Sequence, residues 1–413
     1  MIASLIWILW PTLYALGAMG VGWAASTNES VTLLILSIIG GCLLPLRGIW
    51  YILLARKKGT PLRARMLAQT LIELLLVPVI VFLPRLSYDL FVAFLILYTS
   101  FYTGMQTVNA VVYRRNRVIS NFIPALSQAL LFGHLFVALL VLPADIRRSF
   151  VMSLSGFLLS VLGHSYLCDW LATTIKSKEV AQVFRRISLT LPAFIGLGVP
   201  SRLLDTLRHQ DDVFATDAQI LFNYGRGGLG IAGHCELCID GRTYTYGNYD
   251  PSSRAVFKTM GNGILFRAER ERYLSRLCAE GRTVVAFGLT LPPEQLAALR
   301  QSLAHFHETL VPWEAEARNT PPGEYIHRMA NTLCPEIYRV TDGRFKTYFL
   351  PTINCVTLTA YLLQATDAGN LIGSDIYTPG AYMDAIYRLY CTDNSTVTAL
   401  CTFTAARKEN TEA

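Results

Sequence analysis

Long apolar runs separated by short basic loops constrain this chain most. Up to about Leu204 the apolar residues come in runs of the length that crosses a bilayer, which takes about 20 residues. After Asp205, charges, prolines and glycines occur at the density of a soluble domain. The chain is 52% hydrophobic and 16% charged, which argues against a wholly soluble protein. We therefore expect a polytopic transmembrane domain over residues 1–205 and a soluble domain over residues 206–413.

Seven runs are long enough to span, and together they predict a helical bundle: Ile2–Ala25, Val31–Ala55, Met66–Leu83, Leu90–Tyr113, Val118–Leu142, Phe150–Ile175 and Ile187–Leu204. The first run lacks a basic region ahead of it, so we interpret it as a retained span and not as a cleaved signal peptide. Four ionisable residues fall inside the runs: Glu73, His134, His164 and Asp169. They indicate either a transport path or pairing between helices.

Loop charges predict the orientation. Basic residues follow the second, fourth and sixth runs: Arg56, Lys57, Lys58, Arg63, Arg65, Arg114, Arg115, Arg117, Lys176, Lys178, Arg185 and Arg186. The positive-inside rule places these loops and the amino terminus in the cytoplasm. Seven spans then deliver the C-terminal domain to the periplasmic side of the inner membrane. If the seventh run does not span, that domain is cytoplasmic. The bilayer is thus a partner, and the basic loops explain much of the net charge of +7 without nucleic acid.

The soluble half has the pattern of an α+β domain. We predict strands at Ala218–Phe222, Gly230–Ile239, Arg242–Tyr246, Ile264–Ala268 and Thr283–Leu289, and helices at Glu269–Ala279, from Pro293 to about Leu310, and from about Asn354 onward. The glycines of "GRGGLG", Gly225–Gly230, match a dinucleotide fingerprint, but an alternating strand follows them where that fingerprint needs a helix.

The stretch "GHCELCIDGRTYTYG" predicts a hairpin turning at Asp240 and Gly241. Side-chain alternation puts His234, Glu236 and Cys238 on one face and Cys235 on the other. Two cysteines on opposite faces of a strand do not suit zinc, and a redox pair needs its first cysteine at a helix amino terminus, so no metal and no cofactor are expected. The remaining interpretation is a catalytic base that needs a nucleophile elsewhere.

Cys355 is the best candidate nucleophile. In "PTINCVTLTAYLL" it opens an apolar helix, where the helix dipole and free amides favour a thiolate and can hold an oxyanion. A histidine at the start of a strand packed against that helix completes a thiol and imidazole pair. The alternative is that Cys355 is a small core residue and His234 a satisfied edge histidine.

A family resemblance joins these motifs. The "GH" strand, "YGNYD", "LTLPPEQ" and an aromatic strand leading into "NC" resemble, over about Phe222 to Thr366, the Lnb-type N-terminal periplasmic domain family. That family is similar to circularly permuted papain-like and NlpC-type thiol hydrolases and to lecithin retinol acyltransferase. The resemblance implies that Cys355 is the nucleophile and His234 the general base.

The resemblance also bears on the residues around that pair. The family carries Asn ahead of the "YG", where this chain has Thr245, so Thr245 or Glu236 orients the imidazole. Asn354 either donates to the oxyanion or caps the helix. Among the other cysteines, Cys391 and Cys401 in "CTDNSTVTALC" are spaced to staple a hairpin.

These inferences favour a membrane-anchored thiol hydrolase or acyltransferase acting on an amide or ester acyl group of an envelope peptide, lipoprotein or lipid. A second hypothesis is a catalytically silent receptor or scaffold for an envelope ligand. A third is a transporter with an accessory domain.

Overall fold

The computed structural model describes residues 71, 84–151, 153–154, 210–225, 233–370, 378–391 and 396–404. They belong to two compact units, which we treat separately. One is drawn from residues 1–107 and 125–191, and the other from residues 108–124 and 192–413. The expected domain boundary near residue 205 lies outside the described residues.

Two long helices supply the described part of the membrane half: α5 (Pro84–Arg115) and α6 (Ile119–Val141). Both are long and apolar enough to cross a bilayer, over Tyr88–Arg115 and Ile119–Val141, which is consistent with membrane association. They correspond to the fourth and fifth predicted runs. Within the first unit the Tyr102 hydroxyl donates to Gln128 Oε1 at 3.0 Å, and the Tyr102 and Phe132 rings lie 4.3 Å apart.

The predicted fold class, a seven-span helical bundle followed by a papain-like α+β domain, is wrong. The described residues contain two candidate spanning helices, and the C-terminal half is built on a large antiparallel sheet of eight strands. The other five runs lie almost wholly outside the described residues, as do Glu73, His164 and Asp169. Length and hydropathy identify apolar runs but do not fix what covers them, because an apolar run has the same composition whether lipid or protein buries it.

The sheet follows the order β10-β6-β1-β2-β3-β5-β8-β7 and is antiparallel throughout. Its strands are β1 (Ala218–Tyr224), β2 (His234–Ile239), β3 (Arg242–Gly247), β5 (Ile264–Glu269), β6 (Thr283–Leu289), β7 (Leu310–Pro312), β8 (Glu336–Val340) and β10 (Val397–Phe403). A second, two-stranded sheet pairs β4 (Met260–Asn262) with β9 (Thr347–Phe349). The five predicted strands are confirmed, whereas β4, β7 and β8 were not expected.

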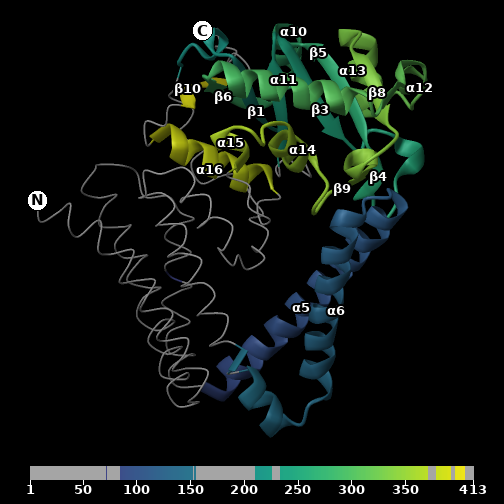
Figure 1. The fold of residues 1–413 in the computed structure, drawn as a ribbon, viewed down its shortest axis with the longest axis vertical. Helices are drawn as coiled ribbons and strands as arrows, with labels where there is room; N and C mark the ends of the chain where they lie inside the picture. The colour runs from purple at the N-terminus through teal and green to yellow at the C-terminus, as the bar shows by residue number, and fades with distance from the viewer. Residues whose placement is uncertain are drawn as a thin grey trace, which may run out of the picture. The chain divides into compact units, whose positions relative to one another are not determined.

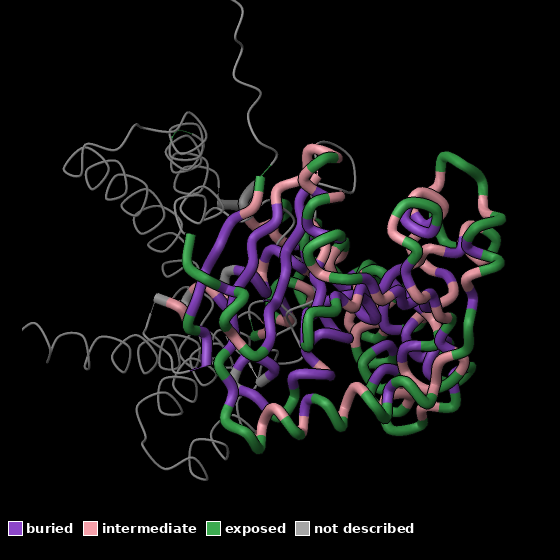
Figure 2. Tube along the Cα trace, turned by 90° about the horizontal axis from the view of Figure 1, so that it is seen from above, coloured by how far each residue is buried: buried purple, intermediate pink, exposed green. Residues whose placement is uncertain are grey.

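Helices cover both faces of the large sheet (Figure 1). One face packs on α10 (Arg270–Ala279), α12 (Glu314–Arg318) and α13 (Tyr325–Leu333), and the other on α14 (Cys355–Leu362) and α16 (Pro379–Cys391), with α11 (Pro293–His307) against α14. Short elements complete the unit: α15 (Asp367–Asn370) and the 3₁₀ turns η2 (Val213–Ala215), η4 (Pro251–Ser253) and η5 (Arg344–Lys346). The central strands β1, β2 and β6 are almost continuously buried, and Figure 2 draws the buried parts of the chain in purple.

The hairpin of β2 and β3 forms as predicted, but its strands separate. Asp240 and Gly241 have φ angles of 50° and 71°, the left-handed pair that a tight two-residue hairpin turn requires. Pairing starts at Ile239 with Arg242 and stops at Leu237 with Tyr244. Beyond that point β2 continues on β1 and β3 continues on β5, so their ends open apart. This opening, between residues 234–236 and 245–247, positions the site.

The turn between α5 and α6 belongs to the same unit as the sheet. Thr352 Oγ1 donates to Asn109 Oδ1 at 2.5 Å, and Thr347 Oγ1 donates to Asn116 Oδ1 at 3.1 Å. Both asparagines are 3% exposed. Buried amide side chains satisfied in this way fix the turn against the segment that leads into α14.

Candidate thiol and imidazole site

Cys355 is the first residue of α14, and Asn354 caps that helix. The Asn354 side chain accepts the Thr357 amide at 3.1 Å, while the Asn354 amide donates to Thr357 Oγ1 at 2.9 Å. The Asn354 carboxamide nitrogen donates to the Leu350 carbonyl at 2.8 Å. Asn354 therefore acts as the helix cap, and its amide group is held within the helix start. Of the two predicted roles, the structure favours the cap over the oxyanion donor.

The Cys355 sulphur lies at the opening between β2 and β3. It accepts the backbone N–H of Cys235 at 3.5 Å. Since β3 no longer pairs with β2 here, this amide has no partner across that ladder and is available to the thiol. Because Cys235 directly follows His234, the hydrogen bond from its amide places the start of α14 beside the backbone of His234. The thiol is 4% exposed, and burial raises the pKa of Cys355 to about 12.

His234 points its Nε2 toward β3. Nε2 lies 3.0 Å from Thr245 Oγ1 and 3.0 Å from the Tyr249 hydroxyl. Nδ1 has no hydrogen-bond partner among the described residues, so one ring nitrogen is left for a proton transfer. Burial, with the positive charge of Arg282, lowers the pKa of His234 to about 3. The imidazole is therefore neutral at physiological pH.

Glu236 lies at the centre of a buried polar cluster. Its Oε1 accepts from Asn223 Nδ2 at 2.7 Å, from Thr245 Oγ1 at 3.2 Å and from the Tyr273 hydroxyl at 2.5 Å. Its Oε2 is buried without a hydrogen-bond partner. Burial raises the pKa of Glu236 to about 7 against the lowering effect of these donors and of Arg282. An ionised Glu236 would leave this buried oxygen without a hydrogen-bond donor. The protonated carboxyl therefore costs less free energy to bury.

Thr245 connects this cluster to the imidazole. Its hydroxyl contacts both Glu236 Oε1 and His234 Nε2, and it lies 3.2 Å from the Tyr249 hydroxyl. When Thr245 donates to Glu236, its lone pairs can accept an Nε2–H from His234. That arrangement leaves Nδ1 as the basic nitrogen. The structure therefore brings together three of the predicted site residues, His234, Glu236 and Thr245, on one face of the hairpin.

The thiol arrives from the opposite face. Glu236 contacts Tyr273 of α10, and Cys238 packs in the core formed with α10, α12 and α13, whereas α14 packs on the other face of β2 and β3. At the unpaired end of β2 and β3 the Cys355 sulphur reaches the backbone amide of Cys235, the residue after His234.

Sequence reasoning missed the tyrosines that complete the site. Tyr249 contacts His234 and Thr245, and the Tyr273 and Tyr325 hydroxyls lie 3.2 Å apart behind Glu236. Tyr249 folds back over Gly247, where an added Cβ would lie 2.6 Å from the ring. The glycine two positions before an aromatic residue in "YGNYD" was the available signal. Tyr273 and Tyr325 come from distant helices and left no local signal.

The cysteines show no metal or disulfide arrangement in the described part of the chain. No group of three metal-ligating side chains occurs among the described residues. Six cysteines among the described residues are free thiols: Cys235, Cys238, Cys278, Cys334, Cys355 and Cys401. The predicted bridge from Cys391 to Cys401 is wrong, because Cys401 is unbridged and Cys391 ends helix α16 rather than opening a hairpin. Most of "GRGGLG" lies outside the described residues.

Comparisons with known proteins add no relative. No family model matches the chain, and neither a curated protein nor a solved structure matches it. The resemblance to the Lnb-type domains therefore stays a prediction that rests on the motifs alone.

Proposed function

We propose that this protein is a membrane-associated thiol hydrolase or acyltransferase that forms a thioester at Cys355. The observation that carries the proposal is the hydrogen bond from the Cys235 amide to the Cys355 sulphur. It places a capped helix start beside the backbone of His234, at the one opening of the hairpin. The substrate would be an amide or ester acyl group on a peptide, lipoprotein or lipid.

The reaction would start from a neutral pair. The pKa of Cys355 is raised and that of His234 is lowered, so neither thiolate nor imidazolium is favoured at rest. As the sulphur attacks the carbonyl carbon, the thiol proton would pass to Nδ1 of His234 and the carbonyl π electrons would move to oxygen. The first amides of α14, which oppose the burial-raised pKa of the Cys355 thiol by hydrogen bonding, would also donate to that oxyanion. Collapse would expel the amine or alcohol, which takes the proton from His234.

The second half of the cycle would mirror the first. Water or another acceptor would lose a proton to His234 as its oxygen or nitrogen attacks the thioester, and the thiol would leave with that proton. Thr245 would act as a positioning residue, because it touches the imidazole and not the reacting atoms. The low exposure of Cys355 implies that a substrate displaces neighbouring side chains on entry.

An acyl-enzyme test addresses this proposal directly. The full chain in detergent is incubated with 4-nitrophenyl acetate or laurate, and intact mass reports an adduct that hydroxylamine removes. We expect one acyl group on the wild type and on Cys238→Ala, and none on Cys355→Ala. Cys238 is the matched control, because it is equally buried, two strand positions from Glu236, and faces the α10 core. An adduct that persists in Cys355→Ala, or its absence from every variant, would exclude the proposal.

The competing function is a silent binding module. The buried thiol and the two neutral groups favour it, since a resting enzyme often holds a more reactive thiol. In the same test a binding module would be folded, but neither the wild type nor any variant would be acylated at Cys355.

We also propose a sidedness for the domain, argued from the end of α5 and the α5–α6 turn. Thr347 binds Asn116 in the turn, and Thr352 binds Asn109 toward the end of α5, which favours the turn and the domain lying on the same side of any membrane that α5 and α6 cross. The positive-inside rule assigns a turn carrying three arginines to the cytoplasm, and free thiols suit a reducing compartment. This proposal keeps the cytoplasmic turn expected from the loop charges and departs from the periplasmic location expected from seven spans. We therefore place the domain at the cytoplasmic face, the outcome expected if the seventh run does not span.

Labelling of Cys334 tests this placement, because Cys334 is an exposed thiol of the domain. A membrane-impermeant maleimide should label it only after cells are permeabilised. Cys334→Ser identifies the labelling that belongs to other thiols. Labelling of Cys334 in intact cells would restore the periplasmic location.

A further inference from the structure

A strained loop presents one aromatic side chain wholly to solvent. Phe257 is 99% exposed and Val256 is 45% exposed. Val256, Phe257 and Lys258 have φ angles of 47°, 54° and 65°, three successive residues in the left-handed region that side chains other than glycine disfavour. Burial of these side chains within the chain does not explain the strain, because they contact solvent. An isolated exposed apolar residue is ordinary, but a strained and exposed aromatic residue needs a reason.

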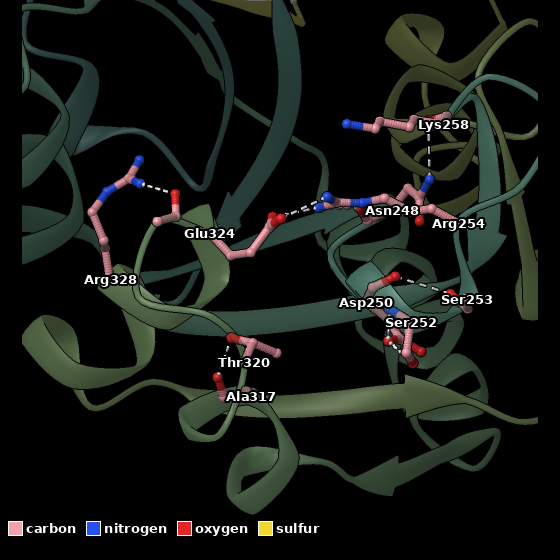
Figure 3. A network of polar contacts seen from close by, with 11 residues as sticks. Asn248, Asp250, Ser252, Ser253, Arg254, Lys258, Ala317, Thr320, Glu324 and Arg328 are labelled. Atoms are coloured by element: carbon pink, nitrogen blue, oxygen red, sulfur yellow. Dashed lines mark hydrogen bonds and ion pairs between the residues drawn. The ribbon is translucent and has the colours of Figure 1, made fainter.

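The loop is held firmly at its base (Figure 3). The Ala255 and Met260 backbones exchange hydrogen bonds of 2.8 and 3.2 Å across it. Asn248 Nδ2 donates to the Lys258 carbonyl at 3.2 Å, and Arg254 makes a bidentate pair with Glu324 at 2.9 and 2.8 Å. These contacts fix the backbone from two sides. The hydrogen bonds and the ion pair of the loop therefore hold its backbone in the conformation that exposes Phe257.

The loop adjoins the segment to which the α5–α6 turn binds. The Leu350 amide donates to the Thr259 carbonyl at 2.9 Å, and Leu350 is 38% exposed. Two residues later, Thr352 binds Asn109 near the end of α5. The exposed apolar side chains thus lie along the edge of the domain from which the candidate spanning helices leave.

Exposed cations occur in the elements next to these apolar side chains. They are Arg114 and Arg115 at the end of α5, Arg117 in the turn, Lys346 in η5 and Lys258 in the loop itself. None of the five has an ion-pair partner among the described residues, whereas Arg254, next to the loop, does. Apolar and aromatic side chains bordered by unpaired cations match the chemistry of an anionic bilayer surface, with its acyl boundary and phosphate headgroups.

We propose that Val256, Phe257 and Leu350, with these flanking cations, form a lipid-binding surface that holds the sheet domain against the leaflet from which the α5–α6 turn emerges. Phe257 and Val256 enter the boundary between headgroups and acyl chains, and Lys258 and Lys346 bind phosphates. The proposal commits to lipid because the surface continues from the ends of two candidate spans. It does not depend on chemistry at Cys355.

Photo-crosslinking in the full chain tests the surface. Benzoylphenylalanine replaces Phe257 in one protein and Arg272 in a second, and both are reconstituted in nanodiscs of phosphatidylcholine with phosphatidylglycerol. Arg272 is the matched control, since its side chain is 68% exposed on α10, which packs on the large sheet away from β4 and β9. We expect about fivefold more lipid adduct at 257 than at 272. Both sites are exposed, so folding is not at risk.

A charge-reversed variant separates lipid binding from simple proximity. The double substitution Lys258→Glu with Lys346→Glu should lower the adduct at 257 by about fivefold or more in nanodiscs that contain phosphatidylglycerol. In phosphatidylcholine alone the same substitution should change it little. Equal adducts at 257 and 272, or adducts at 257 to a second copy of the chain in place of lipid, would overturn the proposal.

Discussion

The two faces of the β2–β3 hairpin differ in what they bury. The face toward α14 is apolar around the thiol, with Tyr246 donating to the Phe345 carbonyl as its polar contact. The face toward α10 and α13 holds Glu236, three donors to its Oε1 and a histidine. The hairpin thus separates Cys355, the candidate nucleophile, from the groups that position His234, the candidate proton acceptor. The difference teaches that the proposed chemistry would need the opening between the strands, because neither face alone holds both the thiol and the imidazole.

The largest effect is expected when the imidazole of His234, which the proposal uses to connect the two faces, is removed. His234→Gln should slow acylation of Cys355 by about 10²- to 10⁴-fold, because the base is removed while the thiol stays. Cys355 and His234 are both neutral between their pKa values, about 12 and about 3, so an inflection of the wild-type rate within that range is expected only near pH 7, from Glu236. Stopped-flow release of 4-nitrophenol across pH measures this. A rate that rises steeply from pH 8 to 10 in both proteins would show an independent thiolate.

Matched tyrosines compare the stability of the two faces. Tyr273→Phe removes a donor to Glu236 and should lower the free energy of unfolding by about 2–3 kcal/mol, whereas Tyr246→Phe removes a bond to a backbone carbonyl and should cost about 1 kcal/mol. Both side chains are fully buried, so differences in exposure are excluded. Urea unfolding of the full chain in detergent measures both. Equal losses would mean that the carboxyl cluster contributes no more than an ordinary hydrogen bond.

The protonation of Glu236 gives a further test of the difference between the two faces of the hairpin. The folded state raises the pKa of this carboxyl to about 7 from 4.5, so its stabilising contribution is complete below pH 4.5 and is lost as pH rises toward 7. Glu236→Gln resembles the protonated form. It should match the wild type near pH 4 and exceed it by about 1–3 kcal/mol above pH 7.

His234 acts in the opposite sense, because its lowered pKa withdraws stability as pH falls from 6.5 to about 3. It is present in both proteins, so the difference between them isolates Glu236. A constant difference at every pH would contradict the raised pKa. Any inflection of the acylation rate near pH 7 should also disappear in Glu236→Gln.

The smallest effect concerns Thr245, which joins the cluster to the imidazole. Thr245→Val should slow acylation by up to about tenfold, and Thr245→Ser should restore most of the rate, since only the hydroxyl contacts Nε2. Single-turnover kinetics with 4-nitrophenyl acetate measure both variants. Loss of function in Thr245→Ser as well would indicate a packing role for the methyl group.

The expectations that held were local ones. The Asp240–Gly241 turn, the five strands and the cap at Asn354 follow from two-residue turn geometry, side-chain alternation and helix-start chemistry. Those that failed needed distant information. Strand β8 was missed because it joins the sheet by pairing with β5, about 70 residues earlier in the chain.

The sequence by itself determined which groups could react: a histidine at a strand start, a cysteine at a helix start, and the turn that sets their register. Only the tertiary structure decided that β2 and β3 open at Leu237, that α14 inserts its first residue there, and that Tyr273 closes on Glu236. It also decided the protonation of each group. The physical reason is that turns and caps depend on a few neighbouring residues, whereas desolvation and strand opening depend on everything packed around them.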